Sequence, residues 1–278
     1  MTCSGLTKSM QFELDRRSLI AGASGAAVSM LLPGSPALAA SVSPERGLES
    51  YRRMLCGAKG EEVLWWFIGD IYAQSPGKSV IPVARTLTIG GYTAGEASDR
   101  NFRYRFREAG VLIDLDTGDR LTRNPLTNAP AEVPLVDEPP HDIDWAVQAD
   151  GSILRTQHGK TSTLNLKWTE TSANLLLLEN TPGSNAFSLA SGDAGADWKS
   201  LESTRTVYAK RADLARPGFV AAQMIYSVSL KLSPPWLATG EPGDHWLIVR
   251  GIGQKSRKHE VVNRDGLALV RRYFPKYL

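Results

Sequence analysis

One short segment of the chain places an imidazole beside two carboxylates. His141, Asp142 and Asp144 lie within four residues of one another, directly after a pair of prolines. Imidazole and carboxylate groups transfer protons near neutral pH, and they can also hold a metal ion. These three side chains are therefore candidate catalytic residues. The simpler interpretation is a polar loop, which is expected after two prolines.

The sequence shows no spacing that is typical of a metal or cofactor site. The other three histidines are scattered, without the spacing of a zinc finger or a zinc protease. The chain has no phosphate loop, no dinucleotide fingerprint and no nucleophile elbow. Asp116-Thr117-Gly118 matches the string of aspartic proteases, but their chemistry needs a second carboxylate, so a hairpin turn is the better interpretation. We predict no metal and no cofactor.

Aromatic residues are dense enough to line an apolar pocket. The chain has seven tryptophans, and large rings that face inward from strands would form the walls of such a pocket. Packing of an ordinary core also explains most of them. The predicted wall residues are Trp65, Tyr104, Trp168 and Trp236, with polar groups supplied by a loop over 141–144 at the mouth.

Arginines alternate with aromatic residues in one expected strand. Arg103, Arg105 and Arg107 occupy every second position, and successive side chains of a strand point to opposite faces. Tyr104 and Arg105 therefore cannot both face one cavity. Arg105 is the alternative pocket residue, able to bind an anionic ligand, should the charged face be the inner one. The simpler interpretation is a solvated outer face.

The pattern of apolar residues predicts short strands between two terminal helices. A Ser-Pro-Glu start and helical spacing predict a helix over 44–55, and beyond it the period changes to two. The expected elements are strands over 63–68, 102–106 with 111–115, a partner strand ending near 122, strands over 132–136, 164–168, 174–179, 227–232 and 245–252, a hairpin at 150–151, a loop over 182–197 and a helix over 265–274.

These elements predict a mainly β fold. We expect a single antiparallel sheet, barrel-like or strongly curved, with short N- and C-terminal helices, because curving the sheet into a barrel removes its edges. No linker indicates a second domain. The chain has 278 residues, a net charge of +3 and 42% hydrophobic residues, which excludes a disordered chain and argues against a nucleic-acid partner.

The first residues of the chain resemble an export signal. Arg16 and Arg17 precede a weakly apolar, glycine- and serine-rich stretch, and Ala37-Leu38-Ala39 is a small-residue cleavage pattern. The arginine pair indicates the twin-arginine export machinery as a partner. We expect residues 1–39 to be removed and a single domain over 40–278 to reach the periplasm or the exterior, without a membrane span. The one cysteine left, at position 56, then has no disulfide partner.

Several stretches resemble one uncharacterised exported family of bacteria and fungi, domain of unknown function eighteen thirty-eight. The similar stretches are Tyr51–Met54, Leu112–Leu121, Arg123–Thr127, Pro234–Leu237 with Gly240 and Gly243, and Phe274–Leu278. The chain departs from the family pattern at Asn128, where glycine is usual, and asparagine tolerates the same left-handed turn. The resemblance implies export but no established activity and no catalytic residues.

Two classes of function fit these observations. One is a cofactor-independent enzyme, such as an isomerase, cyclase or lyase, that acts on an apolar small molecule in a barrel-like pocket. The other is a non-catalytic carrier of such a molecule. Both need an apolar cavity, and the enzyme also needs an acid or base inside it. A module for protein interaction, with no cavity at all, is a third alternative.

Overall fold

The computed structural model describes residues 42–75, 77–170, 174–180, 200–231, 234–237, 246–258 and 264–277. All of them belong to one compact unit, Ala40–Leu278. The signal peptide expected over 1–39 and the loop expected over 182–197 lie outside the described residues. No helix in the described ranges is long and apolar enough to cross a membrane.

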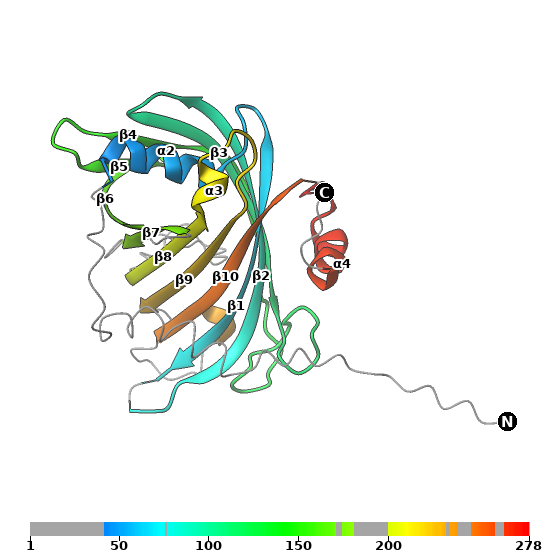
Figure 1. Ribbon diagram of the computed structural model, residues 1–278. Helices are drawn as coiled ribbons and strands as arrows, with labels where there is room; N and C mark the ends of the chain where they lie inside the picture. The colour runs from blue at the N-terminus through cyan, green and yellow to red at the C-terminus, as the bar shows by residue number, and fades with distance from the viewer. Residues whose placement is uncertain are drawn as a thin grey trace. The chain divides into compact units, whose positions relative to one another are not determined.

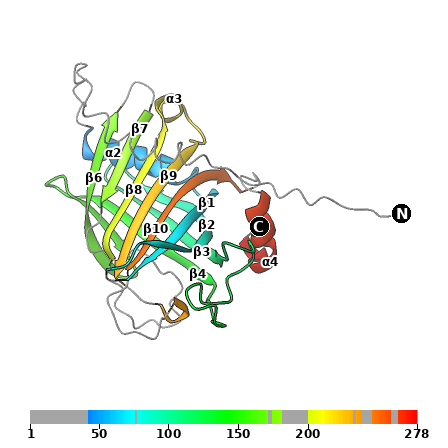
Figure 2. The same cartoon turned by 90° about the horizontal axis from the view of Figure 1, so that it is seen from below.

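Within the described residues, ten antiparallel strands form a closed barrel in which each strand pairs with the next and β10 pairs with β1 (Figure 2). The strands are β1 (Glu62–Gln74), β2 (Ile81–Ala97), β3 (Asn101–Ile113), β4 (Val136–Val147), β5 (Ile153–Gln157), β6 (Lys160–Glu170), β7 (Asn174–Asn180), β8 (Ser200–Lys210), β9 (Ala222–Lys231) and β10 (Trp246–Arg257). The prediction of a mainly β, antiparallel, barrel-like fold is confirmed.

The helices pack against the barrel at different places. They are α2 (Pro44–Leu55), α3 (Arg211–Leu214) and α4 (Arg264–Tyr273), with the short 3-10 helices η1 (Pro235–Leu237) and η2 (Pro275–Tyr277). The two long helices confirm the terminal helices expected from the sequence. Figure 1 shows α4 beside the strands at the C-terminal end of the chain.

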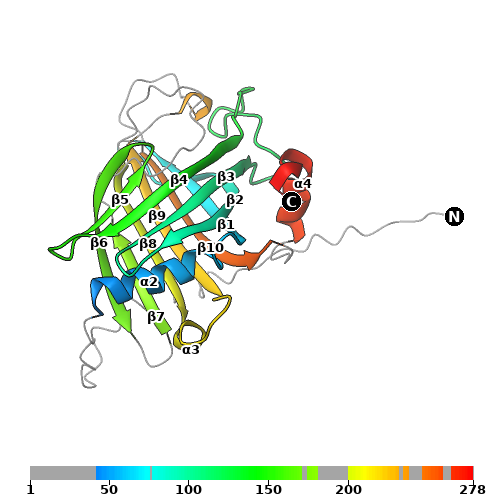
Figure 3. The same cartoon turned by 90° about the horizontal axis from the view of Figure 1, so that it is seen from above.

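Helix α2 lies across one end of the barrel (Figure 3). Ser43 caps its N-terminus by accepting a hydrogen bond from the backbone N–H of Arg46, and Pro44 occupies the first turn, where no N–H is needed. Its apolar face is buried against inward-facing aromatic residues: the Tyr51 ring centroid lies 4.8 Å from that of Trp145. The helix therefore closes this end of the barrel.

A buried lysine completes the C-terminal end of α2. Lys255 of β10 is 3% exposed, and its Nζ donates to the carbonyl oxygens of Arg53 at 2.8 Å and Cys56 at 2.6 Å. Burial lowers the pKa of Lys255 to about 7. Burial likewise raises the pKa of the neighbouring Cys56 thiol to about 12, which fits a structural rather than a reactive thiol.

Residues 63–68 of β1 are all apolar because both faces of the strand are covered there. Val63 and Trp65 face the interior cluster beneath α2, whereas Leu64 and Trp66 belong to an outer cluster. That outer cluster contains residues of β2 and β3 together with Val270 and other residues of the C-terminal segment. The C-terminal helix thus covers the outside of the β1–β3 wall and removes the usual alternation of polar and apolar residues.

The segment 114–135 differs from the prediction. The sequence predicts a partner strand ending near 122 and a strand over 132–136, but the structure has turns with only isolated bridges here. The Asp114 carboxylate accepts hydrogen bonds from the backbone N–H groups of Asp116 and Thr117, both at 2.9 Å. Such side chains compete with a strand ladder for backbone groups. The expected turn at 116–118 is present, with Gly118 at a φ of 73°.

Candidate functional site

The pairing of β3 with β4 brings acidic and imidazole groups to the inner face of the barrel. Glu108 lies opposite Glu138, and Phe106 lies opposite His141. Phe106 packs against the interior cluster, so the period of two along β3 also turns Glu108 inward. Because cross-strand partners share a face of the sheet, Glu138 and His141 face the same interior.

A bulge makes this arrangement possible. Glu138 and His141 are three residues apart, so in a regular strand they would face opposite sides. The register shifts between Phe106 and Glu108, where two residues of β4, at positions 139 and 140, lie opposite one residue of β3, at position 107. The extra residue falls at Pro139–Pro140, a place that prolines tolerate because a bulge leaves backbone groups outside the ladder. Both side chains consequently point inward.

A third segment adds a second imidazole. His158 occupies the two-residue turn between β5 and β6, and its Nε2 lies 3.0 Å from Glu138 Oε1. His141 Nδ1 lies 3.4 Å from the same oxygen, and the two imidazole centroids are 4.0 Å apart. We call Glu138, His141 and His158 the histidine–glutamate cluster.

The histidine–glutamate cluster is open to solvent on one side. The side chains of His141 and Glu138 are 13% and 17% exposed, whereas that of His158 is 56% exposed. Among the described residues, β4 up to Asp142 has ladder partners only in β3, because β5 pairs with β4 only from Ile143 onward. The cluster therefore lies where the wall beside β4 is incomplete.

Burial on the inner face of the barrel shifts the pKa values of Glu108 and His141. Burial, together with the charge of Glu138 and against the opposing charge of Arg205, raises the pKa of Glu108 to about 8. Burial lowers the pKa of His141, whereas Glu138 opposes this effect. A carboxyl group that keeps its proton and a neutral imidazole are thus both present at neutral pH.

Aromatic rings separate this polar level from α2. The Tyr92 ring centroid lies 5.4 Å from that of Tyr104 and 4.9 Å from that of Phe106. Glycines on neighbouring strands make room for the rings: a Cβ at Gly253 would lie 2.5 Å from the ring of Phe67. An apolar surface therefore adjoins the acidic and imidazole groups.

The structure places the three candidate catalytic residues on two faces of β4. The expected polar loop over 141–144 is wrong, because these residues belong to a strand. His141 faces inward. Asp142 and Asp144 face outward, where Arg103 Nε lies 2.6 Å from Asp144 Oδ1 and Arg103 Nη1 lies 4.0 Å from Asp142 Oδ2. The structure therefore does not bring either aspartate together with His141.

The four predicted pocket aromatics divide between two clusters. Trp65, Tyr104 and Trp168 lie in or against the cluster beneath α2. Trp65 Nε1 donates to the Leu55 carbonyl oxygen at 2.9 Å, which ties β1 to the helix. Trp236, in contrast, belongs to a second interior cluster with residues of β1, β9 and β10. These four rings therefore do not line one common wall.

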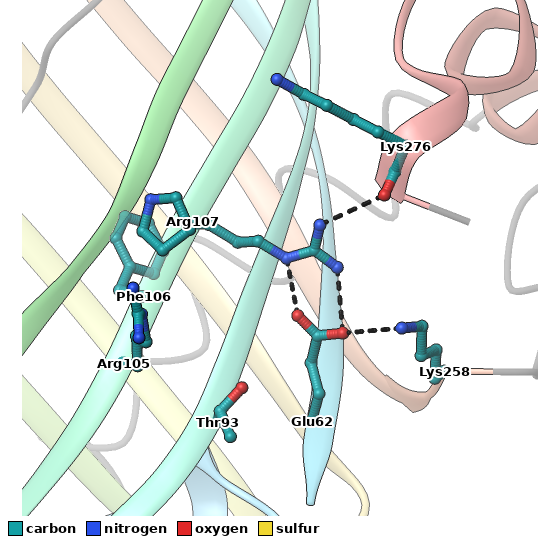
Figure 4. A pocket seen from close by; sticks show the side chains of 8 residues that line it. Glu62, Thr93, Arg105, Phe106, Arg107, Lys258 and Lys276 are labelled. Atoms are coloured by element: carbon teal, nitrogen blue, oxygen red, sulfur yellow. Dashed lines mark hydrogen bonds and ion pairs between the residues drawn. The ribbon is translucent and has the colours of Figure 1, made fainter.

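Arg105 lies on the outer face of β3, beside an open hollow of about 370 Å³ (Figure 4). The hollow is lined by Glu62, Thr93, Arg105, Phe106, Arg107, Pro140, Lys258 and Lys276. Arg107 donates to both Glu62 oxygens, at 2.6 and 2.9 Å, and Lys258 Nζ lies 3.1 Å from Glu62. Burial opposes these partners, but together they hold the pKa of Glu62 below its usual value. Much of the positive charge here is therefore already paired.

Three residues of the interior site were not predicted from the sequence. Glu108 continues the inward series of alternating aromatic residues, so the period of two along β3 could have indicated it. Glu138 reaches the interior only through the bulge, and His158 reaches Glu138 only through the turn between β5 and β6. No local sequence pattern indicates that Glu138 or His158 belongs to the site.

Comparisons with known proteins give no family. No family model matches the sequence, and no curated protein matches it. Among solved structures, the chain is similar to Ail, the attachment invasion locus protein of Yersinia pestis, with a TM-score of 0.21 and 7% sequence identity. The match covers 71% of this chain and 99% of that chain. A similarity this weak carries no argument, so function must be argued from the residues of the barrel.

Proposed function

We propose that the protein is an enzyme that isomerises, cyclises or eliminates from a mainly apolar small molecule bound inside the barrel. One observation carries this proposal: Glu108 and the histidine–glutamate cluster converge on the inner face, directly beside an aromatic layer. Acidic groups are rare on the inner face of a barrel unless they have a task, because removing them from water is costly.

Partial exposure of inward-facing side chains supports an accessible interior at this level. Phe67, Phe106 and Glu108 face inward and are only partly buried, whereas Trp65 and Val249, which face inward nearer the two ends, are fully buried. An inward-facing side chain keeps exposed surface only where neighbouring side chains leave space. A small molecule that fills this space would gain apolar contacts.

The reaction classes follow from the side chains. Isomerisation, cyclisation and elimination need proton transfer but no external electrons, and a carboxyl group can supply it. In this proposal Glu108 transfers the proton, and the aromatic layer around Tyr92 and Phe106 holds the apolar body of the substrate. His141 and its cluster bind the polar group of the substrate. Asp142 and Asp144 have no part, since they face outward.

A carrier is the alternative, and it needs only the apolar surface. Native mass spectrometry of the protein purified from its host would identify a retained molecule, and incubation of fresh molecule with the protein would then show whether it changes. Conversion to a product supports the enzyme. Retention without conversion selects the carrier. Full retention by His141→Ala and Phe106→Ala would place the molecule elsewhere.

Export and family membership stay proposals as well. The arginine pair at 16–17 and the small-residue pattern ending at Ala39 support removal of residues 1–39 and a periplasmic or secreted protein. The resemblance of 112–121 to domain of unknown function eighteen thirty-eight supports that family. Replacing Arg16 and Arg17 by lysines tests the route, because the lysine pair should block export.

A further inference from the structure

We propose that Glu138, His141 and His158 bind one divalent transition-metal ion, such as Zn²⁺ or Fe²⁺. The three side chains each offer one donor atom, and all three donor atoms lie within 4.8 Å of one another. The proposal concerns metal binding alone, so it does not depend on whether the barrel converts a substrate.

The spacing of the donor atoms fits a shared ion. Zinc binds nitrogen and oxygen ligands at about 2.0–2.2 Å, so two ligands at right to tetrahedral angles lie about 3.0–3.4 Å apart. Glu138 Oε1 lies 3.0 Å from His158 Nε2 and 3.4 Å from His141 Nδ1. Both distances fall in that interval.

The donor types select the class of metal. Two imidazoles and one carboxylate form the ligand set of several catalytic zinc sites and of non-haem iron(II) sites. Mg²⁺ and Ca²⁺ prefer oxygen ligands and would gain little from the imidazoles. Three protein ligands leave further coordination positions free, and the exposure of His158 lets water or a substrate reach them.

Neighbouring groups hold the His141 ring in a ligating orientation. The side-chain amide of Gln157 lies 3.0 Å from His141 Nε2, so Nδ1 is the nitrogen that faces Glu138. The nearer atom is the amide nitrogen, which can only donate, so His141 Nε2 accepts this hydrogen bond and Nδ1 carries the proton. Ligation through Nδ1 places the proton on Nε2, and Gln157 then accepts it with its amide oxygen after a turn of the amide, which is the hydrogen bond that a ligating histidine usually donates. In the absence of metal, Nδ1 lies 3.2 Å from the Pro139 carbonyl oxygen, and a bound ion would replace a proton shared at this position.

Two unusual backbone features aim the other ligands. His158 has a φ of 50°, and Asn128 is the one other non-glycine residue with positive φ among the described residues. A two-residue hairpin turn needs positive φ, which histidine adopts more readily than most residues, and this turn directs the His158 side chain toward Glu138. The bulge at 139–140 turns Glu138 inward, and bulges often re-aim side chains next to functional sites.

The ordinary alternative is a hydrogen-bonded trio in which the Glu138 carboxylate simply accepts hydrogen bonds from both imidazoles. Isothermal titration of the chelator-treated, dialysed whole protein with ZnCl₂ separates the two. We expect one equivalent of Zn²⁺ to bind, and Glu138→Gln and His158→Asn each to weaken binding at least ten-fold. Asparagine keeps the left-handed turn, so His158→Asn removes the ligand without straining the backbone.

The control is Glu96→Gln, which removes an exposed carboxylate paired with Lys59 and should bind Zn²⁺ like the wild type. Far-UV circular dichroism checks that every variant is folded. Absence of zinc binding in the folded wild type overturns the proposal, and so does wild-type affinity in both Glu138→Gln and His158→Asn. A protein that converts its substrate after chelation but binds no Zn²⁺ would overturn the metal site and leave the proposed function intact.

Discussion

Replacing Lys255 by methionine should change how stability depends on pH. Burial lowers the pKa of Lys255 from 10.5 to about 7. The folded protein therefore releases this proton near pH 7, whereas the unfolded chain keeps it to about pH 10.5. Between these values the unfolded chain binds more protons, so this lysine makes the wild type more stable as pH rises. Below pH 7 the full cost of the buried charge is present.

The size of the effect follows from the same shift. One pKa unit corresponds to about 1.4 kcal/mol, so the wild type should gain about 2–3 kcal/mol from this group between pH 7 and pH 9. Lys255→Met lacks that gain. It also leaves the carbonyl oxygens of Arg53 and Cys56 without their donor, which costs about 1–3 kcal/mol each. The variant should therefore lose stability relative to the wild type as pH rises.

Urea unfolding followed by tryptophan fluorescence at pH 6, 7, 8 and 9 measures this difference. Titrations shared by both proteins cancel when the two free energies of unfolding are subtracted. Lys59→Met is the matched control, because the Lys59 side chain is 69% exposed and should show a constant difference. A constant difference for Lys255→Met as well would refute the assignment of a deprotonating buried lysine.

Three further changes should have outcomes that the packing dictates. Gly253→Ala should lower the free energy of unfolding by about 1–3 kcal/mol, because its Cβ would lie 2.5 Å from the Phe67 ring; urea unfolding measures this. Ser43→Ala should cost about 1 kcal/mol through loss of the cap on α2, measured by thermal unfolding, and an unchanged melting temperature would contradict it. Asp144→Asn should change stability by less than about 1 kcal/mol, since its ion pair with Arg103 is exposed, and should not alter ligand retention in native mass spectrometry. Reduced retention would bring the outer face of β4 into the site.

The elements that carry strong local signals could be predicted from the sequence. Helix α2 has a serine cap, a proline in its first turn and a regular apolar face, and the strand over 63–68 is rich in β-branched and aromatic residues. The helix was predicted with the bounds that the structure shows, whereas the strand was predicted to end too early, because β1 continues to Gln74. The hairpin at 150–151 was confirmed as well, between β4 and β5.

The failures have a common physical cause, which is competition between local and tertiary preferences. Two prolines and several charges make 137–144 look like a loop, but pairing with β3 and a bulge keep the segment in the sheet. In 114–135 the balance is reversed: the side chains of Asp114 and Asn124 bind nearby backbone N–H groups, and the expected strands do not form.

The same cause explains what was missed at the site. His141 was chosen from its neighbours in the sequence, Asp142 and Asp144, but a strand sends adjacent side chains to opposite faces. Its neighbours in space are Glu138 and His158, which come from a bulge and a turn. Spacing along the chain therefore indicated one residue that faces inward, His141, together with two aspartates that face outward.

The rate at which Glu108→Gln converts the small molecule retained by the wild type tests the central claim most directly. Glutamine keeps the shape of the side chain but cannot transfer a proton. We predict that kcat falls by about 100-fold or more, while the variant stays folded and still retains the molecule in native mass spectrometry. A Glu108→Gln variant that turns over at the wild-type rate would contradict the account.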